Sequence, residues 1–305
     1  MINITKRDDV ITVKTVTALI YGQPGIGKTS LACTTERPLV LDFDGGIYRT
    51  PYRQDAVQVR TWEDVIGLSA DDLAPYATVV VDTVGRLLDC LSLYLIQSNP
   101  KLGRGTGALT LQGYGELKGS YAAWLKTLLS YGLDVVLVAH DREEKDNDNL
   151  IVRPDIQGGS YGEVFKRCDA IGYLYRGAKS AILDFDPSDR WIGKNAGALA
   201  AEPVPNFATA KDYGAGIIRD IKSTLNRMSV ENQTAVAEVE VWKAKLDAIT
   251  EAAQLTAMVA ELAGVNGAVA AQAKALLTQR AAMLGLKWEG PKGKGKYVPA
   301  QPHTT

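Results

Sequence analysis

A glycine-rich segment near the start of the chain has the residue types and spacing needed to hold phosphate groups. Residues 22–29 are GQPGIGKT and fit the pattern Gly-x-x-x-x-Gly-Lys-[Ser/Thr] in full. Glycines let successive backbone N–H groups converge on phosphates, Lys28 would neutralise the terminal phosphates, and the Thr29 hydroxyl would bind Mg²⁺. The residues expected to contact the phosphates are Gly22, Gln23, Pro24, Gly25, Ile26, Gly27, Lys28, Thr29 and Ser30.

Carboxylates at the ends of two apolar runs could complete this site. Asp82 ends the run 76–82, and we expect it to hold Mg²⁺ through water; capping the next helix is the alternative. Asp42 and Asp44 end the run that begins at Pro38, and strand alternation points both to one face. Strand ends of an open parallel sheet face the same crevice as the loop. Asp44 is therefore the expected catalytic base, and Asp42 its support or a turn cap.

His140 is a lone polar residue at the end of the apolar run 133–140. At the same edge of the sheet it could sense the terminal phosphate, as a catalytic residue beside Lys28 and Asp44. It could equally be a hydrogen-bonded histidine at a strand end with no switching role. The residues alone leave both interpretations open.

Apolar runs alternate with helical patterns as far as residue 140, which predicts an α/β fold with a parallel, doubly wound sheet. The expected strands lie at 11–21, 38–44, 57–62, 76–82 and 133–140, and the expected helices at 30–35, 83–97 and 116–131. Shorter strands, some of them antiparallel, are expected at 169–176, 180–186 and 190–195. Runs without polar residues suit strands that are buried on both faces.

The composition changes near residue 229, which divides the chain into three predicted parts. Residues 1–228 form the core, and 229–286 are rich in Ala, Leu, Glu and Gln with helical apolar spacing, broken near Gly264–Gly267. Residues 287–305 carry lysines among Gly and Pro and are expected to be a basic, disordered tail.

Composition excludes several classes of protein. The net charge is −1, so binding to a polyanion would need local patches of basic residues. Three separated cysteines and two histidines argue against a disulfide scaffold or a structural zinc site. No run reaches the roughly 18 apolar residues that would span a membrane. We therefore expect a soluble, cytoplasmic protein without membrane partners.

Taken together, the loop, LVLDFDGG (39–46), VVVDTVGRL (79–87) and VVLVAHDRE (135–143) resemble the RecA-type ATPase core. The closest likeness is to short phage-encoded RecA-like proteins that act in single-strand annealing or recombination. The resemblance covers about residues 10–225 and implies a three-layer α/β/α P-loop NTPase core with a helical C-terminal appendage. It also implies ATP and Mg²⁺ as cofactors.

The resemblance implies roles for individual residues. Asp82 matches the acid that holds Mg²⁺ and contributes to nucleotide binding, and Asp44 matches the catalytic carboxylate, where RecA has the longer Glu. His140 stands where RecA has its switch glutamine. Lys194 matches a lysine that reaches the nucleotide of a neighbouring subunit, so a ring or filament of identical chains is implied.

Two segments, 99–119 and 141–163, occupy the positions of the family's DNA-facing loops. The first segment has six glycines among residues 101–119 and is expected to be a long flexible loop. Basic groups beside an aromatic ring suit single-stranded DNA, and the expected DNA-binding residues are Lys101, Arg104, Tyr114 and Arg153. Residues 141–150 contain five acids and two basic residues, which argues against DNA binding there.

The combined prediction is a slowly hydrolysing ATPase that binds single-stranded DNA and promotes annealing or recombination in the cytoplasm of a bacterial host. A single-strand binding protein is a possible partner for its C-terminal helices. One alternative is a DNA-independent P-loop switch, or a replication or packaging loader. A small-molecule kinase is the weaker alternative, because no arginine-rich lid follows the core.

Overall fold

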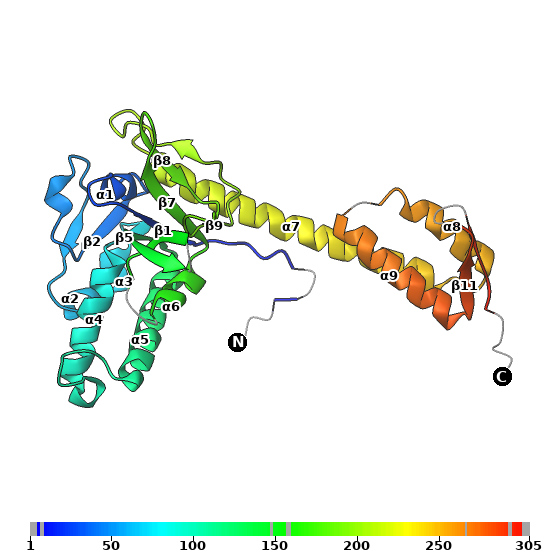
Figure 1. The fold of residues 1–305 in the computed structure, drawn as a ribbon, viewed down its shortest axis with the longest axis horizontal. Coiled ribbons are helices and arrows are strands. Elements are labelled where there is room, and N and C mark those ends of the chain that lie inside the picture. The colour runs from blue at the N-terminus through cyan, green and yellow to red at the C-terminus, as the bar shows by residue number, and fades with distance from the viewer. Residues whose placement is uncertain are drawn as a thin grey trace. The chain divides into compact units, whose positions relative to one another are not determined.

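A computed structural model describes residues 5–6, 9–146, 149–156, 160–265, 267–291 and 295–300. It separates into a unit of residues 13–225 and a second unit of residues 1–12 and 226–305. The first unit is built on a ten-stranded sheet (Figure 1). Within the described residues, no helix is both long enough and apolar enough to cross a membrane.

Six parallel strands form the centre and one edge of the sheet. In spatial order they are β7 (Ala170–Arg176), β1 (Thr17–Gly22), β5 (Asp134–Asp146), β4 (Thr78–Asp82), β2 (Pro38–Asp42) and β3 (Ala56–Gln58). Four further strands of the described residues are antiparallel to their neighbours: β6 (Asn149–Pro154), β8 (Ala181–Asp184), β9 (Lys194–Asn195) and β10 (Glu202–Pro203). Parallel strands need crossover helices, and these cover the two faces.

Helices pack on both faces of the sheet, so the first unit has three layers (Figure 1). One face is covered by α2 (Glu63–Ile66), α3 (Ala70–Leu73), α4 (Val84–Ser98), α5 (Leu111–Ser130) and α6 (Ser160–Arg167). The other face is covered by α1 (Lys28–Ala32) and the first turns of α7 (Tyr213–Asp247). The predicted α/β/α architecture is therefore confirmed.

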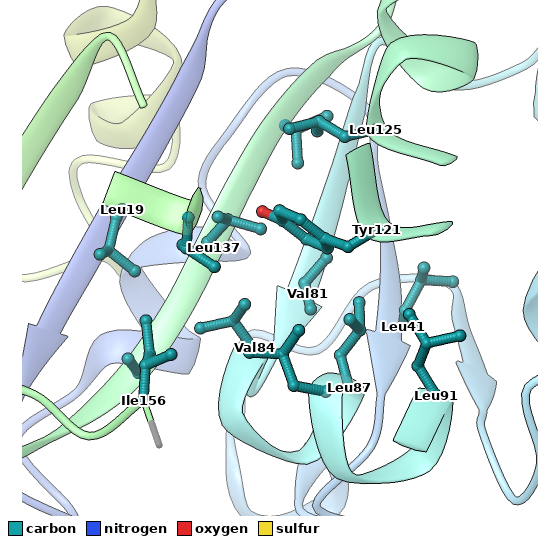
Figure 2. Packing of buried hydrophobic residues seen from close by; sticks show 14 of the residues in the cluster. Leu19, Leu41, Val81, Val84, Leu87, Leu91, Tyr121, Leu125, Leu137 and Ile156 are labelled. Carbon is teal, nitrogen blue, oxygen red and sulfur yellow. The ribbon is translucent and has the colours of Figure 1, made fainter. Parts of the chain in front are cut away.

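Alternation along the buried strands divides the core between the two faces. In β1, Leu19 and Tyr21 pack toward α4 and α5, whereas Ala18 and Ile20 pack toward α1 and α7. Figure 2 shows the first cluster, in which strand leucines and valines meet Tyr121 and other apolar side chains of α4 and α5. A strand buried on both faces must be apolar at every position, which is why these runs lack polar residues.

The connection between α4 and α5 is shorter than predicted. The 3-10 helix η2 (Pro100–Leu102) follows α4, and Thr110 caps α5 by accepting a hydrogen bond from the backbone N–H of Gly113 at 3.1 Å. α5 therefore begins at Leu111 rather than near residue 116. Only residues 103–110 remain as a loop, so the expectation of a flexible loop over 99–119 was wrong, because a cap started the helix early.

The segment expected as the second loop is largely a β-hairpin. β5 continues past His140 to Asp146 and pairs with β6, with Arg142 opposite Arg153. α6 then begins at Ser160. Residues 147–148 and 157–159 lie outside the described residues. Charged side chains on both strands hid this hairpin from a reading based on apolar runs.

The second unit has its own core. The end of α7, α8 (Ala252–Leu262) and α9 (Gly267–Met283) pack around buried side chains such as Trp242 and Leu255. The break expected near Gly264–Gly267 separates α8 from α9. The boundary between the two units, at residues 225 and 226, falls inside α7.

The predicted disordered tail contains an ordered hairpin. β11 (Leu286–Glu289) pairs with β12 (Lys296–Pro299), and Trp288 lies edge-on to Tyr297 at 5.1 Å between ring centroids. Tyr297 also packs against the core of this unit, which stabilises a segment whose composition alone suggested disorder. Residues 292–294 and 301–305 of the tail lie outside the described residues.

Leu137 tests the first core cluster because it is fully buried in the central strand. We expect Leu137→Ala to lower the free energy of unfolding by about 2–5 kcal/mol, since it removes buried methyl groups and leaves a cavity. Leu93→Ala, at a side chain that is 59% exposed, is the matched control and should change stability by less than about 0.5 kcal/mol. Urea unfolding followed by circular dichroism measures both variants, and equal losses would contradict the assigned packing.

Candidate functional site

The glycine-rich loop joins β1 to α1 at the carboxyl edge of the sheet. Gly25 and Gly27 have backbone φ angles of 75° and 106°, which residues with a Cβ rarely adopt. A Cβ at Gly22 would lie 2.1 Å from the carbonyl oxygen of Leu174 on β7. These glycines are therefore required both by the turn and by the close approach of neighbouring backbone.

Lys28 is buried beneath this loop and is 5% exposed. Its ammonium group donates hydrogen bonds to the carbonyl oxygens of Gly22 and Gln23 at 2.7 and 2.8 Å. Burial lowers the pKa of Lys28 to about 8, while the negative charges of Asp141, Asp82 and Asp44 oppose that shift. The lysine is thus held where phosphate oxygens would replace the carbonyl groups as its partners.

Thr29 and Asp82 bring two hard oxygen donors together. The Thr29 hydroxyl donates to Oδ2 of Asp82 at 2.6 Å, and Asp82 is 5% exposed. Burial raises the pKa of Asp82, and the hydrogen bond from Thr29 opposes this. Adjacent hydroxyl and carboxylate oxygens are ligands that Mg²⁺ prefers, so this pair fits the ion that the loop implies. The peptide bond after Asp82 is cis.

Asp44 lies just beyond the end of β2, in the same pocket as Lys28. Nε2 of His140 is 3.3 Å from Oδ2 of Asp44, and Nε of Arg86 is 3.6 Å from Oδ1. The hydrogen bond with His140, together with the charge of Arg86, holds the pKa of Asp44 below its ordinary value. The carboxylate is therefore ionised and well held, but it is a weak base in this arrangement.

Asp42 has the capping role that its position allowed. Its carboxylate accepts hydrogen bonds from the backbone N–H groups of Gly46 and Ile47 at 2.9 and 3.0 Å. Asp42 thereby shapes the turn that follows β2 and leads into the 3-10 helix η1 (Ile47–Arg49). Asp42 and Asp44 do not act as a pair on one strand face, because β2 ends at Asp42.

Most of the residues predicted for phosphate, metal and catalysis line one pocket of about 260 Å³, together with residues that the sequence did not single out. Gly22, Gln23 and Ile26 were predicted to contact the phosphates but are not part of its lining. Arg49 and Thr50 line its wall beside Ser30, whose hydroxyl is 2.8 Å from that of Thr50. Arg86, on the first turn of α4, adds the ion pair to Asp44. Arg86 follows Asp82 by four positions. A basic residue so soon after a strand-end carboxylate was the sequence signal that could have identified Arg86 as part of the site.

The residues proposed for DNA contact are not gathered at this pocket. Lys101 and Arg104 are exposed at the α4–α5 connection, with no ion pair among the described residues (Figure 1). Tyr114 lies on α5 rather than in a loop. Arg153 lies on β6, and its Nε is 3.5 Å from Glu144.

Lys194 is engaged within its own subunit. It lies on β9 beside β7, and its ammonium group donates to the carbonyl oxygen of Cys168. In the register of the sheet, Lys194 is next to Ile171, which pairs with Leu19 in the middle of β1, away from the loop that follows Gly22. Its contact with a neighbouring nucleotide stays a prediction.

The lowered pKa of Lys28 predicts a pH dependence of phosphate binding. Only the ammonium form attracts phosphates, and in the free protein that form is lost as the pH rises through about 8. The dissociation constant for ATP should therefore increase above pH 8 by up to about tenfold per pH unit. Lys28→Arg keeps a charge throughout this range and should remove the dependence, which fluorescence titration with a labelled nucleotide measures. A flat profile for the unmodified protein would contradict the assignment.

The comparisons with known proteins agree with this geometry. A family model described as an AAA domain matches residues 14–196, which is more than half of the chain and contains the loop, Asp44, Asp82 and His140. No curated protein matches the chain. With its glycine-rich loop at the edge of a three-layer α/β/α core, the chain belongs to the AAA-domain family and carries a P-loop ATPase domain.

Proposed function

We propose that this P-loop ATPase hydrolyses ATP slowly, binds single-stranded DNA and promotes annealing or recombination, like the phage-encoded RecA-like proteins it resembles. The observation that carries the proposal is the contact between Asp44 and His140. It joins a carboxylate in the phosphate pocket to the strand that continues into the β5–β6 hairpin. The state of the nucleotide could thereby reach a surface outside the pocket.

Four side chains of the pocket have distinct tasks in the proposed hydrolysis. Lys28 and the loop N–H groups would hold the phosphates, and Thr29 and Asp82 would hold Mg²⁺. The ion, when bound, supplies positive charge to the phosphate oxygens. Asp44 would orient the attacking water and accept its proton. Because Asp44 is tied to His140 and Arg86, its low basicity supports slow turnover.

Replacement of Asp44 separates binding from hydrolysis. Asp44→Asn keeps the size of the side chain, so nucleotide affinity should stay within about threefold, whereas turnover should fall by about 10²–10⁴-fold through loss of the base. Phosphate release and fluorescent-nucleotide titration measure the two quantities. Turnover equal to that of the unmodified protein would show that another group activates water.

Lys101 and Arg104 support the DNA part of the proposal. Both are exposed on the connection at the tip of α4 and α5, with no described carboxylate to neutralise them (Figure 1). Basic side chains without a paired carboxylate attract the phosphates of a nucleic acid, and their binding releases the counterions bound to it. The proposed oligomer, the trans role of Lys194, a single-strand binding protein as partner and a bacterial cytoplasm are supported by the resemblance alone.

The decisive test of the DNA-dependent function compares single-stranded with double-stranded oligonucleotides. We expect single strands to stimulate ATP hydrolysis more strongly. The double variant Lys101→Ala/Arg104→Ala should bind them more weakly, and its salt slope should be smaller by up to about 1.4, since each neutralised phosphate contributes about 0.7. Arg60→Ala/Lys211→Ala, at two other exposed basic residues, is the control. Absence of stimulation would refute the DNA-dependent function.

A DNA-independent ATPase switch is the second candidate, and one observation favours it. Glu144 lies 3.5 Å from both Arg142 and Arg153, so the β5–β6 hairpin neutralises much of its own positive charge. A hairpin with little free positive charge is better suited to a protein partner than to DNA. Hydrolysis that does not respond to either form of DNA would favour this function.

A further inference from the structure

A second pocket of about 220 Å³ lies behind His140, apart from the phosphate pocket. Its walls are α4, the first turns of α5 and the chain at Asp155 and Ser160. His140 lines both pockets. None of the roles proposed above uses this space.

Several polar groups at this pocket lack partners among the described residues. The Asp155 carboxylate and the Tyr114 hydroxyl make no hydrogen bond or ion pair there. Ser160 is only 3% exposed, and its Oγ has no hydrogen-bond partner. Nδ1 of His140 is also buried without one. A buried hydroxyl without a partner is costly, so Ser160 indicates a ligand that would satisfy it.

The charges at the pocket favour a cation. Asp89 and Asp155 both line it and lie close enough for their charges to interact. Among the described residues that line this pocket, Arg86 is the one Lys or Arg side chain, and it is already shared between Asp44 and Asp89, at 3.6 Å from each. Carboxylate and hydroxyl oxygens both accept hydrogen bonds. An anionic ligand would be repelled, whereas a cation with several N–H donors would find acceptors.

We propose that this pocket binds a guanidinium or primary ammonium group. Its volume is below the roughly 300–1,000 Å³ of pockets for larger ligands, so the occupant is about the size of one basic side chain. Asp155 and Asp89 bind the positive charge, and the buried Ser160 hydroxyl accepts an N–H donor. The source is either a free small cation or the basic side chain of a protein partner.

Occupation of the pocket also reaches the phosphate site, and this part rests on the proposed ATPase function. A bound cation competes with Arg86 for Asp89, so Arg86 pairs more fully with Asp44. Fuller pairing with Arg86 occupies an oxygen of the Asp44 carboxylate that would otherwise orient the attacking water, so hydrolysis slows. The site therefore inhibits the ATPase. By linkage, a nucleotide also changes the affinity of the pocket for the cation.

The test uses agmatine, which carries a guanidinium and an ammonium group, in calorimetric titrations of the full chain. We expect a dissociation constant of about 1 mM or tighter. Asp155→Asn and Ser160→Ala should each weaken binding, the former by about tenfold, because a charge-assisted hydrogen bond is lost. Asp71→Asn, at an exposed carboxylate of α3, is the matched control. Glutarate, an anion of similar length, should not bind.

A short peptide with one arginine, acetyl-Gly-Arg-Gly-amide, distinguishes the two sources. Tighter binding of the peptide than of agmatine identifies a protein side chain as the ligand, and the reverse identifies a small cation. Failure of both to bind, or equal agmatine affinities in the unmodified protein and Asp155→Asn, overturns the proposal.

Two further measurements separate this site from the phosphate site. Lys28→Ala should lose ATP affinity and still bind agmatine. Agmatine binding therefore tests the second pocket even if the proposed ATPase function is wrong. Saturating agmatine should lower turnover at least about twofold in the unmodified protein and leave Asp155→Asn unaffected. Binding without any change in turnover overturns the coupling to Asp44.

Discussion

Burial of the Lys28 charge is the constraint around which the carboxyl edge of the sheet is organised. An ammonium group this deeply buried stays charged only when it is hydrogen-bonded and surrounded by negative potential, because burial otherwise favours the neutral amine. Two loop carbonyls accept its hydrogens, and Asp82, Asp44 and Asp141 lie close enough to stabilise the charged form. The same side chain therefore shapes the free loop and meets the phosphates.

Asp44 extends this arrangement beyond the loop. Its carboxylate contacts His140 on β5 and Arg86 on α4, and both contacts favour the ionised form. A carboxylate whose ionised form is stabilised in this way is a weak base. Because Arg86 also contacts Asp89, the resistance to proton uptake depends on charges outside the phosphate pocket.

The buried strands were predictable because burial on both faces excludes polar residues from them. The same criterion failed where strands carry charge, as in the β5–β6 hairpin, and where a cap such as Thr110 starts a helix within a glycine-rich stretch. It failed again at the C-terminal hairpin, in which Trp288 and Tyr297 supply order that a Gly-, Pro- and Lys-rich composition concealed. In each case a contact or a cap outweighed composition.

The sequence by itself determined the loop, the order of the central elements along the chain and the gathering of Asp44, Asp82 and His140 at one edge of the sheet, although β2 ends at Asp42 and β5 continues past His140. Those features follow from local pattern together with the rule that parallel strands end at one edge. Only the tertiary structure decided that Arg86 lies on Asp44, that Arg49 lines the phosphate pocket, and that a second pocket lies behind His140. Such contacts depend on how α4, α5 and η1 pack against the sheet. Because the contacting residues are far apart in the chain, no local spacing in the sequence reveals them.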